Sequence, residues 1–386
     1  MSAEVSTGAI FRPAWAEIDC GALAHNVKTL LDHVSPSELC AVVKADGYGH
    51  SAIVVAQEVL RAGATRLAVA LVEEGLILRE AGIEAPILLL SEPRSQAMPA
   101  CIANGITPTL YSVDGIIGAH NAAQTLGVRV GVHLKIDTGM HRVGADPQDV
   151  LELARLIVDS DVLELEGIWT HLSVADVADD PYTAVQIALF DATVKALAVH
   201  GIVAPIHHLA NSAAAIARPE ARRDWVRCGI ALYGYLPSSE LRAGLDQVLE
   251  PVLSLKAQVS FVRTLDAGER PSYGRRRALE QDSDVAVVPL GYADGLPRKL
   301  GEHGGEVLIR GRRRRIIGNV TMDQIIIDCA SIGEIVPGDE VVLLGRQGQE
   351  CISAEEWAQR TGTISYEILC AIGPRVPRVV VHDQRS

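Results

Sequence analysis

The sequence predicts an eight-stranded parallel α/β barrel of the (β/α)8 type, followed by a mainly β domain. Two observations lead to this prediction. Short apolar runs alternate with helix-like segments through the first part of the 386-residue chain, and strand periodicity replaces this pattern near residue 245. Hydrophobic residues make up 48% of the chain and aromatic residues only 4%, so aliphatic side chains must fill a large core, as in buried parallel sheets.

The first predicted element is a short extended segment at residues 15–19, whose Asp19 can cap the helix that follows. Eight apolar runs come next, with helix-like segments such as 51–62 and 150–158 between them. The runs cover residues 39–44, 67–71, 87–90, 106–110, 128–136, 163–170, 206–210 and 225–227. Eight strand–helix repeats of this size indicate a (β/α)8 barrel.

Beyond residue 245, apolar residues alternate with other residues over 253–261, which is typical of a β-strand. Gly and Asp-Gly turns separate the later strand-like runs, and a helical pattern returns at 354–360. The later runs cover residues 285–289, 306–309, 316–322, 325–328 and 340–344. We therefore expect a barrel domain at 13–245 and a mainly β domain at 246–386, with residues 1–12 associated with the latter.

Charge and cysteine usage exclude several classes of function. The formal net charge of −13 disfavours binding to nucleic acid or to an anionic membrane. The arginine run at 312–315 is interpreted as a solvated hairpin between two strands. Seven scattered cysteines without a CxxC pair indicate reduced thiols rather than disulfides or a zinc site. Without a signal sequence at 1–13 or an apolar segment long enough to span a bilayer, we expect a cytoplasmic protein with no membrane partner.

Catalytic groups of such barrels lie at the carboxyl ends of the strands. Lys44 closes the first apolar run, where desolvation would make its amine a nucleophile or base, although a strand-end lysine can also simply reach solvent. The loops after the seventh and eighth strands carry Asn211-Ser212 and Gly229-Ile230. A hydroxyl and close backbone N–H groups can cradle a phosphate, although each loop alone is also ordinary turn chemistry. Together, these features predict a phosphorylated cofactor bound covalently to lysine.

Eight motifs follow one another along nearly the whole chain. They are 41–50 (AVVKADGYGH), 135–142 (KIDTGMHR), Thr170-His171, 208–212 (HLANS), 227–234 (RCGIALYG), 272–274 (SYG), 291–295 (GYADG) and 321–324 (TMDQ). In composition and in order, these motifs resemble those of the bacterial alanine racemase family.

The resemblance implies a barrel that binds pyridoxal 5′-phosphate, a β domain, and a homodimer in which the partner's β domain completes each active site. Lys44 would hold the cofactor covalently and act as one proton-transfer base. The partner subunit's Tyr273 would be the second base on the opposite face of Cα, because a single base mostly returns its own proton. His171 and Arg227 would form the polar network that lowers the pKa of this tyrosine.

Other roles follow from the same resemblance. Arg227, oriented by His208, would face the pyridine nitrogen and disfavour its protonation, which limits side reactions. Arg142 would contact the cofactor's phenolic oxygen and the substrate carboxylate, and Lys135 would position it if carbamylated. The phosphate would be held by Tyr48, Ser212, Gly229, Ile230 and Tyr366, with Asn211 and His171 also at the cofactor. The partner's Tyr292 and Met322 would border the substrate, supported by Asp323.

The implied activity is interconversion of L- and D-alanine, which supplies D-alanine for peptidoglycan. Three alternatives stay open: a racemase of the same family with serine, lysine or broad specificity, a decarboxylase on the same plan, and a non-catalytic protein that binds pyridoxal phosphate. A metal enzyme is disfavoured because the strand ends lack a ligand cluster. Departures from the family pattern occur at Asp46-Gly47, at Ser51, and at Cys228, where relatives usually carry proline.

Overall fold

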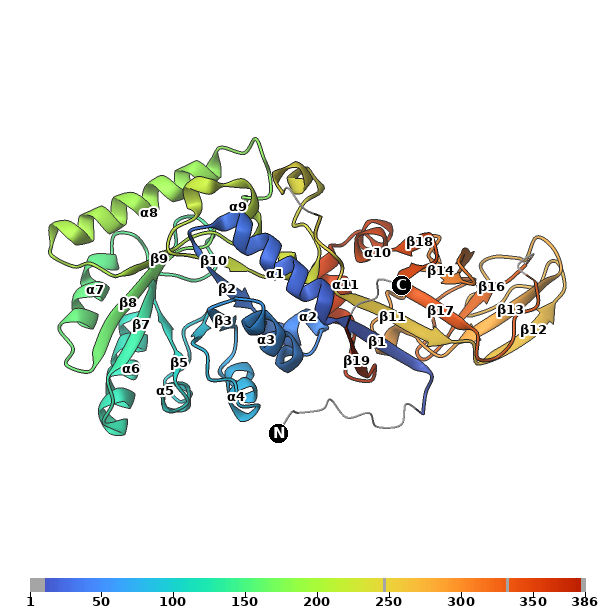
Figure 1. Cartoon of the computed structure of the whole chain (residues 1–386), viewed down its shortest axis with the longest axis horizontal. Helices are drawn as coiled ribbons and strands as arrows, with labels where there is room; N and C mark the ends of the chain where they lie inside the picture. Colours follow the sequence, from blue (N-terminus) through green and yellow to red (C-terminus); the bar gives the residue numbers. More distant parts are fainter. Residues whose placement is uncertain (1–10, 246–247, 331–332, 383–386) are drawn as a thin grey trace. The chain divides into compact units, whose positions relative to one another are not determined.

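The computed structural model describes residues 11–245, 248–330 and 333–382 (Figure 1). The chain forms two compact units. The barrel unit comprises residues 22–47 and 52–250, and the β unit comprises 11–21, 48–51 and the chain from 251 onward. The predicted domain boundary at 245/246 adjoins residues 246–247, which lie outside the described ranges. Of the predicted N-terminal segment 1–12, only residues 11 and 12 are described.

The barrel unit confirms the predicted (β/α)8 fold. Parallel pairing runs from β10 through β2, β3 and β4 to β5, and from β6 through β7 and β8 to β9. β9 and β10 are joined by a hydrogen bond from Arg227 N to Ala210 O, 2.9 Å long. The strands are β2 (Glu38–Val42), β3 (Arg66–Val69), β4 (Ile87–Leu89), β5 (Ile106–Thr107), β6 (Thr109–Leu110), β7 (Val130–Lys135), β8 (Leu163–Trp169), β9 (Ile206–His208) and β10 (Trp225–Cys228).

The run predicted as one strand at 106–110 is split into β5 and β6 at Pro108. Proline has no N–H to donate to a neighbouring strand. Its carbonyl still accepts a hydrogen bond from His133 N at 3.0 Å, so this short stretch joins the two arcs of the barrel: β5 pairs with β4, and β6 pairs with β7.

Helices alternate with these strands, and α4 to α8 lie outside them in Figure 1. Local sequence sets their ends: Ser112 Oγ accepts from Gly115 N at 3.0 Å at the start of α6, which ends at the left-handed Gly127. Asp19 caps α1 as predicted, accepting from Gly21 N. The helices are α1 (Cys20–Val34), α2 (Lys44–Gly49), α3 (Ala52–Arg61), α4 (Val72–Glu80), α5 (Met98–Ala103), α6 (Val113–Leu126), α7 (Val150–Val158), α8 (Tyr182–Val199), α9 (Ser212–Ala217), and the 3-10 turns η1 (Pro219–Ala221), η2 (Ile230–Tyr233) and η3 (Ser239–Gly244).

Helix α8 corrects one expectation of the sequence analysis. By length and composition it is apolar enough to cross a membrane, whereas no such segment was expected. Its buried residues recur every three or four positions, from Thr183 through Ile187 and Phe190 to Leu197. This periodicity is that of an outer barrel helix that packs one face against its own protein.

The β unit contains a sheet with the order β15-β14-β17-β11-β1-β19, in which β18 also pairs with β17, and a three-stranded sheet β12-β13-β16. Its strands are β1 (Ala14–Asp19), β11 (Leu253–Gln258), β12 (Phe261–Leu265), β13 (Ser283–Val288), β14 (Glu306–Ile309), β15 (Arg312–Arg315), β16 (Ile325–Asp328), β17 (Glu340–Gln347), β18 (Glu350–Ile352) and β19 (Arg378–Val381). Its helices are η4 (Tyr292–Asp294), α10 (Ala354–Thr361) and α11 (Ser365–Ala371).

Three details of the β unit differ from the sequence analysis. β1 was expected in the barrel domain but lies between β11 and β19 in this unit. Every second residue of both β1 and β11 is buried in the sheet that they share. The predicted strand at 316–322 is wrong: Ile316 makes only an isolated bridge to Ile327, and Gly318 has a φ of 70°. The arginine run is itself strand β15, and the turn of the hairpin lies before it, at 310–311.

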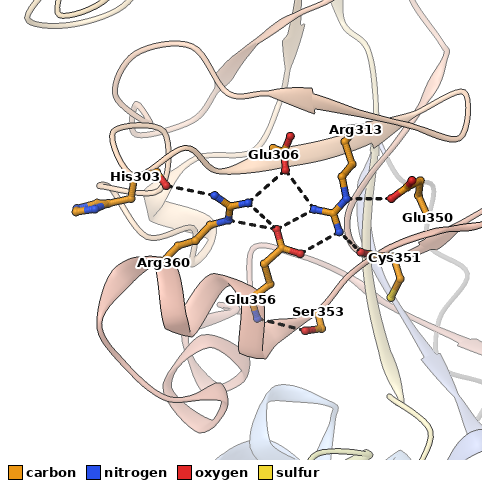
Figure 2. A network of polar contacts seen from close by, with 8 residues as sticks. All are labelled: His303, Glu306, Arg313, Glu350, Cys351, Ser353, Glu356 and Arg360. Atoms are coloured by element: carbon orange, nitrogen blue, oxygen red, sulfur yellow. Dashed lines mark hydrogen bonds and ion pairs between the residues drawn. The ribbon is translucent and has the colours of Figure 1, made fainter.

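Arg313 of β15 is the centre of a charged network that ties the hairpin to α10 and β18 (Figure 2). Its guanidinium bonds both Glu356 oxygens at 2.9 and 3.0 Å, and reaches Glu350 at 3.0 Å and Glu306 at 3.2 Å. Arg360 also contacts Glu306 and Glu356, each at about 3.2 Å. One cation thus holds carboxylates from three segments of the chain.

Replacement of Arg313 by alanine is expected to destabilise the β unit by about 2 kcal/mol, because it leaves three carboxylates with one remaining guanidinium. Urea denaturation followed by circular dichroism measures this loss. Arg312→Ala is the matched control, since Arg312 lies next to Arg313 on the same strand but is exposed. Equal midpoints for the two variants would show that the network adds nothing to stability.

Candidate active site

Lys44 is the first residue of α2, two positions after β2 ends; the sequence placed it at the strand end itself. A left-handed turn follows it, with φ values of 52° at Ala45, 51° at Asp46, 62° at Gly47, 55° at Tyr48 and 81° at Gly49. Each non-glycine residue in this conformation costs roughly 1–2 kcal/mol. Such strain persists only where surrounding contacts impose it, and it is common at functional sites.

Two carboxylates hold the turn. Glu74 Oε1 accepts from Ala45 N at 2.7 Å, and Asp46 Oδ1 accepts from Ala52 N at 2.8 Å. The departure at Asp46 therefore has a structural role, since it caps α3.

Arg227 lies on β10 with its side chain buried inside the barrel. Its Nη1 donates to His208 Nδ1 at 2.8 Å and to His208 O at 3.0 Å. Its Nη2 donates to Thr170 O and Leu209 O, and lies 3.5 Å from His171 Nδ1. Among the described residues, Nε–H has no hydrogen-bond acceptor. The guanidinium is thus fixed in orientation with one donor left for a ligand.

Several cations gather with Arg227 at the carboxyl ends of the strands. Burial is the main cause that lowers the pKa of Lys135 to about 7, and Arg227, Arg142 and Lys44 lower it further. Burial and the same positive charges hold the pKa of His171 well below its usual value, so His171 is neutral. This excess of positive charge favours binding of anionic groups.

The loop after β7 carries Arg142, which is exposed. Asp137 Oδ1 accepts from the backbone N–H groups of Gly139, Met140 and His141 at 2.9 to 3.0 Å. Asp137 is therefore a loop-capping carboxylate.

The loops after β9 and β10 are in contact. Ser212 Oγ accepts from Gly229 N at 2.9 Å, so this N–H is engaged in the protein and the hydroxyl proton of Ser212 stays available. Asn211 caps α9 by accepting from Ala214 N at 3.1 Å, and it also donates to Leu172 O. Ile230 begins η2.

Cys228, the other departure near this loop, is fully buried at the end of β10. Burial, followed by the effect of Cys40, raises the pKa of its thiol to about 12. Cys228 is therefore a neutral packing residue. The hydrogen bond between Ser212 and Gly229 fixes the adjacent loop in place of a proline ring.

In the β unit, Tyr273 lies on a loop and is 71% exposed. The neighbours Ser272 and Gly274 have φ values of 68° and 80°. Asn319 holds this loop through two hydrogen bonds. Its Nδ2 donates to Tyr273 O at 3.0 Å, and its backbone carbonyl accepts from Ser272 Oγ at 2.7 Å. The phenol is thus presented outward on a firmly held backbone.

Tyr292 and Met322 are brought together by backbone hydrogen bonds from Tyr292 N to Thr321 O and from Ala293 N to Met322 O. Gly291 makes this approach possible, because a Cβ there would lie 2.3 Å from Met322 O. Both side chains are largely exposed, at 40% and 53%.

Four further residues of interest lie in the β unit. Asp323 accepts from Arg375 at 2.7 Å. The rings of Tyr48 and Tyr366 lie 6.1 Å apart, which brings together two residues expected at the phosphate. His50 is buried, with Nδ1 2.9 Å from Tyr48 O.

Sequence reasoning missed His133 and Asn319. His133 lies two residues before Lys135 on β7, and its Nδ1 is 2.9 Å from His208 Nε2. The two-residue spacing placed both side chains on one face of the strand, which was a usable signal. Asn319 lies in segment 316–322, which was predicted as a strand, so its support of the Tyr273 loop was not expected.

Comparison with known proteins gives full-length matches. The family model for the alanine racemase N-terminal domain matches residues 18–237, and that for the C-terminal domain matches residues 252–380. The alanine racemase of Desulfovibrio desulfuricans is 40% identical over 371 residues, covering 96% of this chain and 98% of the relative.

Two solved structures are similar over nearly the whole chain. The alanine racemase of Bacillus anthracis with bound L-Ala-P has a TM-score of 0.92 at 37% identity, covering 98% of this chain and 97% of that one. A histidine racemase of Leuconostoc mesenteroides subsp. sake has a TM-score of 0.90 at 28% identity, covering 97% of this chain and 100% of that one.

Proposed function

Because this chain belongs to the alanine racemase family, we propose that it interconverts L- and D-alanine with pyridoxal 5′-phosphate as its cofactor. The observation that carries the proposal is the strand-end group in the barrel unit, where Lys44, Lys135 and His171 surround a fixed Arg227. We also propose that the protein is a cytoplasmic homodimer and that it supplies D-alanine for peptidoglycan.

The donor set fits the cofactor. The proposed ligand carries a phosphate, a phenolic oxygen and an unprotonated ring nitrogen, all of which accept hydrogen bonds. The barrel unit offers Arg227 Nε–H, Arg142 and the Ser212 hydroxyl, with an excess of positive charge. Arginine suits the ring nitrogen because it donates and does not give up its proton at neutral pH.

We assign the individual residues as follows. Lys44 attaches the cofactor covalently, and Arg227, positioned by His208, donates to the ring nitrogen. His171 lies beside it. Arg142 binds the phenolic oxygen and the substrate carboxylate. The phosphate is assigned to the Ser212 hydroxyl, the backbone N–H of Ile230, Asn211 at the start of α9, and the Tyr48–Tyr366 pair, while Gly229 contributes by holding Ser212 through its own N–H.

When bound, the cofactor supplies the conjugated system that acidifies the Cα–H bond of the attached amino acid. The chain supplies the proton transfers. Lys44 serves one face of Cα, and the partner's Tyr273 serves the other, so a proton removed from one face is replaced on the opposite face. The partner's Tyr292 and Met322 restrict the space for the substrate side chain, and Asp323 supports that loop through Arg375.

Lys135 is assigned as the residue that orients Arg142. With a pKa of about 7, a substantial fraction of its amine is uncharged at neutral pH and can add carbon dioxide. The uncharged amine forms a carbamate and releases one proton, so that a neutral group becomes an anion beside Arg142. The product would lessen the repulsion between the clustered positive charges.

Incubation of the protein, loaded with pyridoxal phosphate, with L-alanine is expected to yield D-alanine rapidly, as measured by chiral chromatography. L-serine, L-lysine and L-histidine are run in parallel, the last because of the histidine racemase relative. Formation of D-product mainly from one of these three amino acids would support racemisation but assign a different substrate. Absence of D-product from all four, with cofactor attached, would refute the racemase assignment.

A further inference from the structure

A chain of polar side chains continues from Arg227 into the barrel interior. Beyond the Arg227–His208 contact, His208 Nε2 lies 2.9 Å from His133 Nδ1. His133 Nε2 lies 3.9 Å from Glu166 Oε1, and has no hydrogen-bond partner among the described residues. Both histidines are completely buried. Glu166 reaches an open pocket that Pro86 and Gly105 also line, at the edge where the strands begin.

The direction of each proton in this chain follows from its donors. Arginine can only donate, so His208 Nδ1 must be the acceptor from Arg227. Burial lowers the pKa of both His208 and His133, so each ring is neutral and carries one N–H. His208 therefore bears its proton on Nε2 and donates to His133 Nδ1. His133 in turn bears its proton on Nε2, toward Glu166.

Two glycines on neighbouring strands make room for this arrangement. A Cβ at Gly167 would lie 2.4 Å from His133 Cε1 and 2.5 Å from its Nδ1. A Cβ at Gly131 would lie 2.4 Å from Glu166 Oε2. The indoles of Trp169 and Trp225 stack on His208, with interplanar angles of 15° and 17°. The rings are thus held by packing as well as by hydrogen bonds.

We propose that His133 is a positioning residue for the proposed cofactor site: by accepting from His208 Nε2–H, it keeps His208 in the tautomer whose Nδ1 accepts from Arg227. This inference rests on the proposed function. Without His133, the buried Nε2–H has no partner. In the other tautomer, His208 Nδ1–H would oppose the N–H of Arg227, and the guanidinium would lose the contact that orients it.

Three variants separate this role from packing. His133→Phe removes the acceptor, and we expect the Kd for pyridoxal phosphate to rise and kcat to fall, each by about tenfold to a hundredfold. His133→Asn places an amide oxygen near the position of Nδ1 and is expected to recover most of both losses. His207→Phe is the matched control, because His207 precedes His208 on β9 and its ring packs against Phe190 instead.

The tautomers are tested directly in wild-type protein labelled with 15N-histidine and free of cofactor, with signals assigned by the single variants. We expect an unprotonated Nδ1 and a protonated Nε2 for both His208 and His133. In His133→Phe, the His208 pattern is expected to change or become mixed. Cofactor affinity is measured by titrating pyridoxal phosphate against tryptophan fluorescence.

A protonated Nδ1 on His208 in the wild type would overturn the inference. So would wild-type cofactor affinity in His133→Phe, or an equal loss in His133→Asn and His133→Phe, which would reduce the role to filling space. The tautomer and affinity measurements need no turnover. If the wild type bound cofactor but formed no D-amino acid, the proposed function would fail while these two readouts still decided the role of His133.

Discussion

Replacement of Lys44 by alanine is expected to abolish covalent attachment of pyridoxal phosphate and to lower the rate of racemisation by at least about 10⁴-fold. The proposal gives this amine two tasks, nucleophilic attachment and proton transfer at one face of Cα, and each alone contributes several powers of ten. Reduction with borohydride followed by intact-mass measurement detects the attachment. Chiral chromatography measures the rate.

The matched control is Lys28→Ala, which removes an exposed lysine from α1 of the same unit. It should retain both attachment and activity. If Lys44→Ala still yielded a reduced adduct at one defined position, another amine would hold the cofactor. Lys135 would then be the first candidate, because its pKa of about 7 makes it the more nucleophilic at neutral pH.

The barrel was readable from sequence because its strands are buried on both sides. Such strands appear as short apolar runs, and β4, β7 and β8 lie within the runs predicted for them. The strands with which a given strand pairs are harder to predict from sequence. Residues 15–19 show an extended pattern, but pairing of β1 with β19, more than 350 positions away, has no local signal.

The sequence indicates the positions of Lys135 and His171, because each is a polar residue at or just after the end of a strand, β7 and β8 respectively. The site was not predictable where tertiary contacts override local preference. Ala45 and Asp46 adopt left-handed backbone although neither is glycine, and the contacts that hold them come from Glu74 and Ala52. The proton directions through His133 likewise depend on three strands meeting inside the barrel.

Replacement of Tyr273 by phenylalanine is expected to slow racemisation by roughly 10²- to 10⁴-fold while leaving the cofactor attached, because it removes the base from one face only. In deuterated water, proton NMR should show that one enantiomer of alanine still exchanges its Cα hydrogen without inversion, through Lys44. Tyr111→Phe, which changes a tyrosine of the barrel unit, is the control. Undiminished racemisation in Tyr273→Phe would refute the two-base assignment.

Mixing the two inactive variants tests whether Tyr273 acts on the partner's site. In a homodimer with shared sites, a mixed dimer of Lys44→Ala and Tyr273→Phe has one site with both defects and one with neither. Random exchange makes about half of the dimers mixed, so about a quarter of wild-type activity should return. The exposure of Tyr273, Tyr292 and Met322 on the β unit fits such a donated surface. If native mass spectrometry showed mixed dimers but activity did not return, Tyr273 would act within its own chain, and the partner would have to be removed from the mechanism.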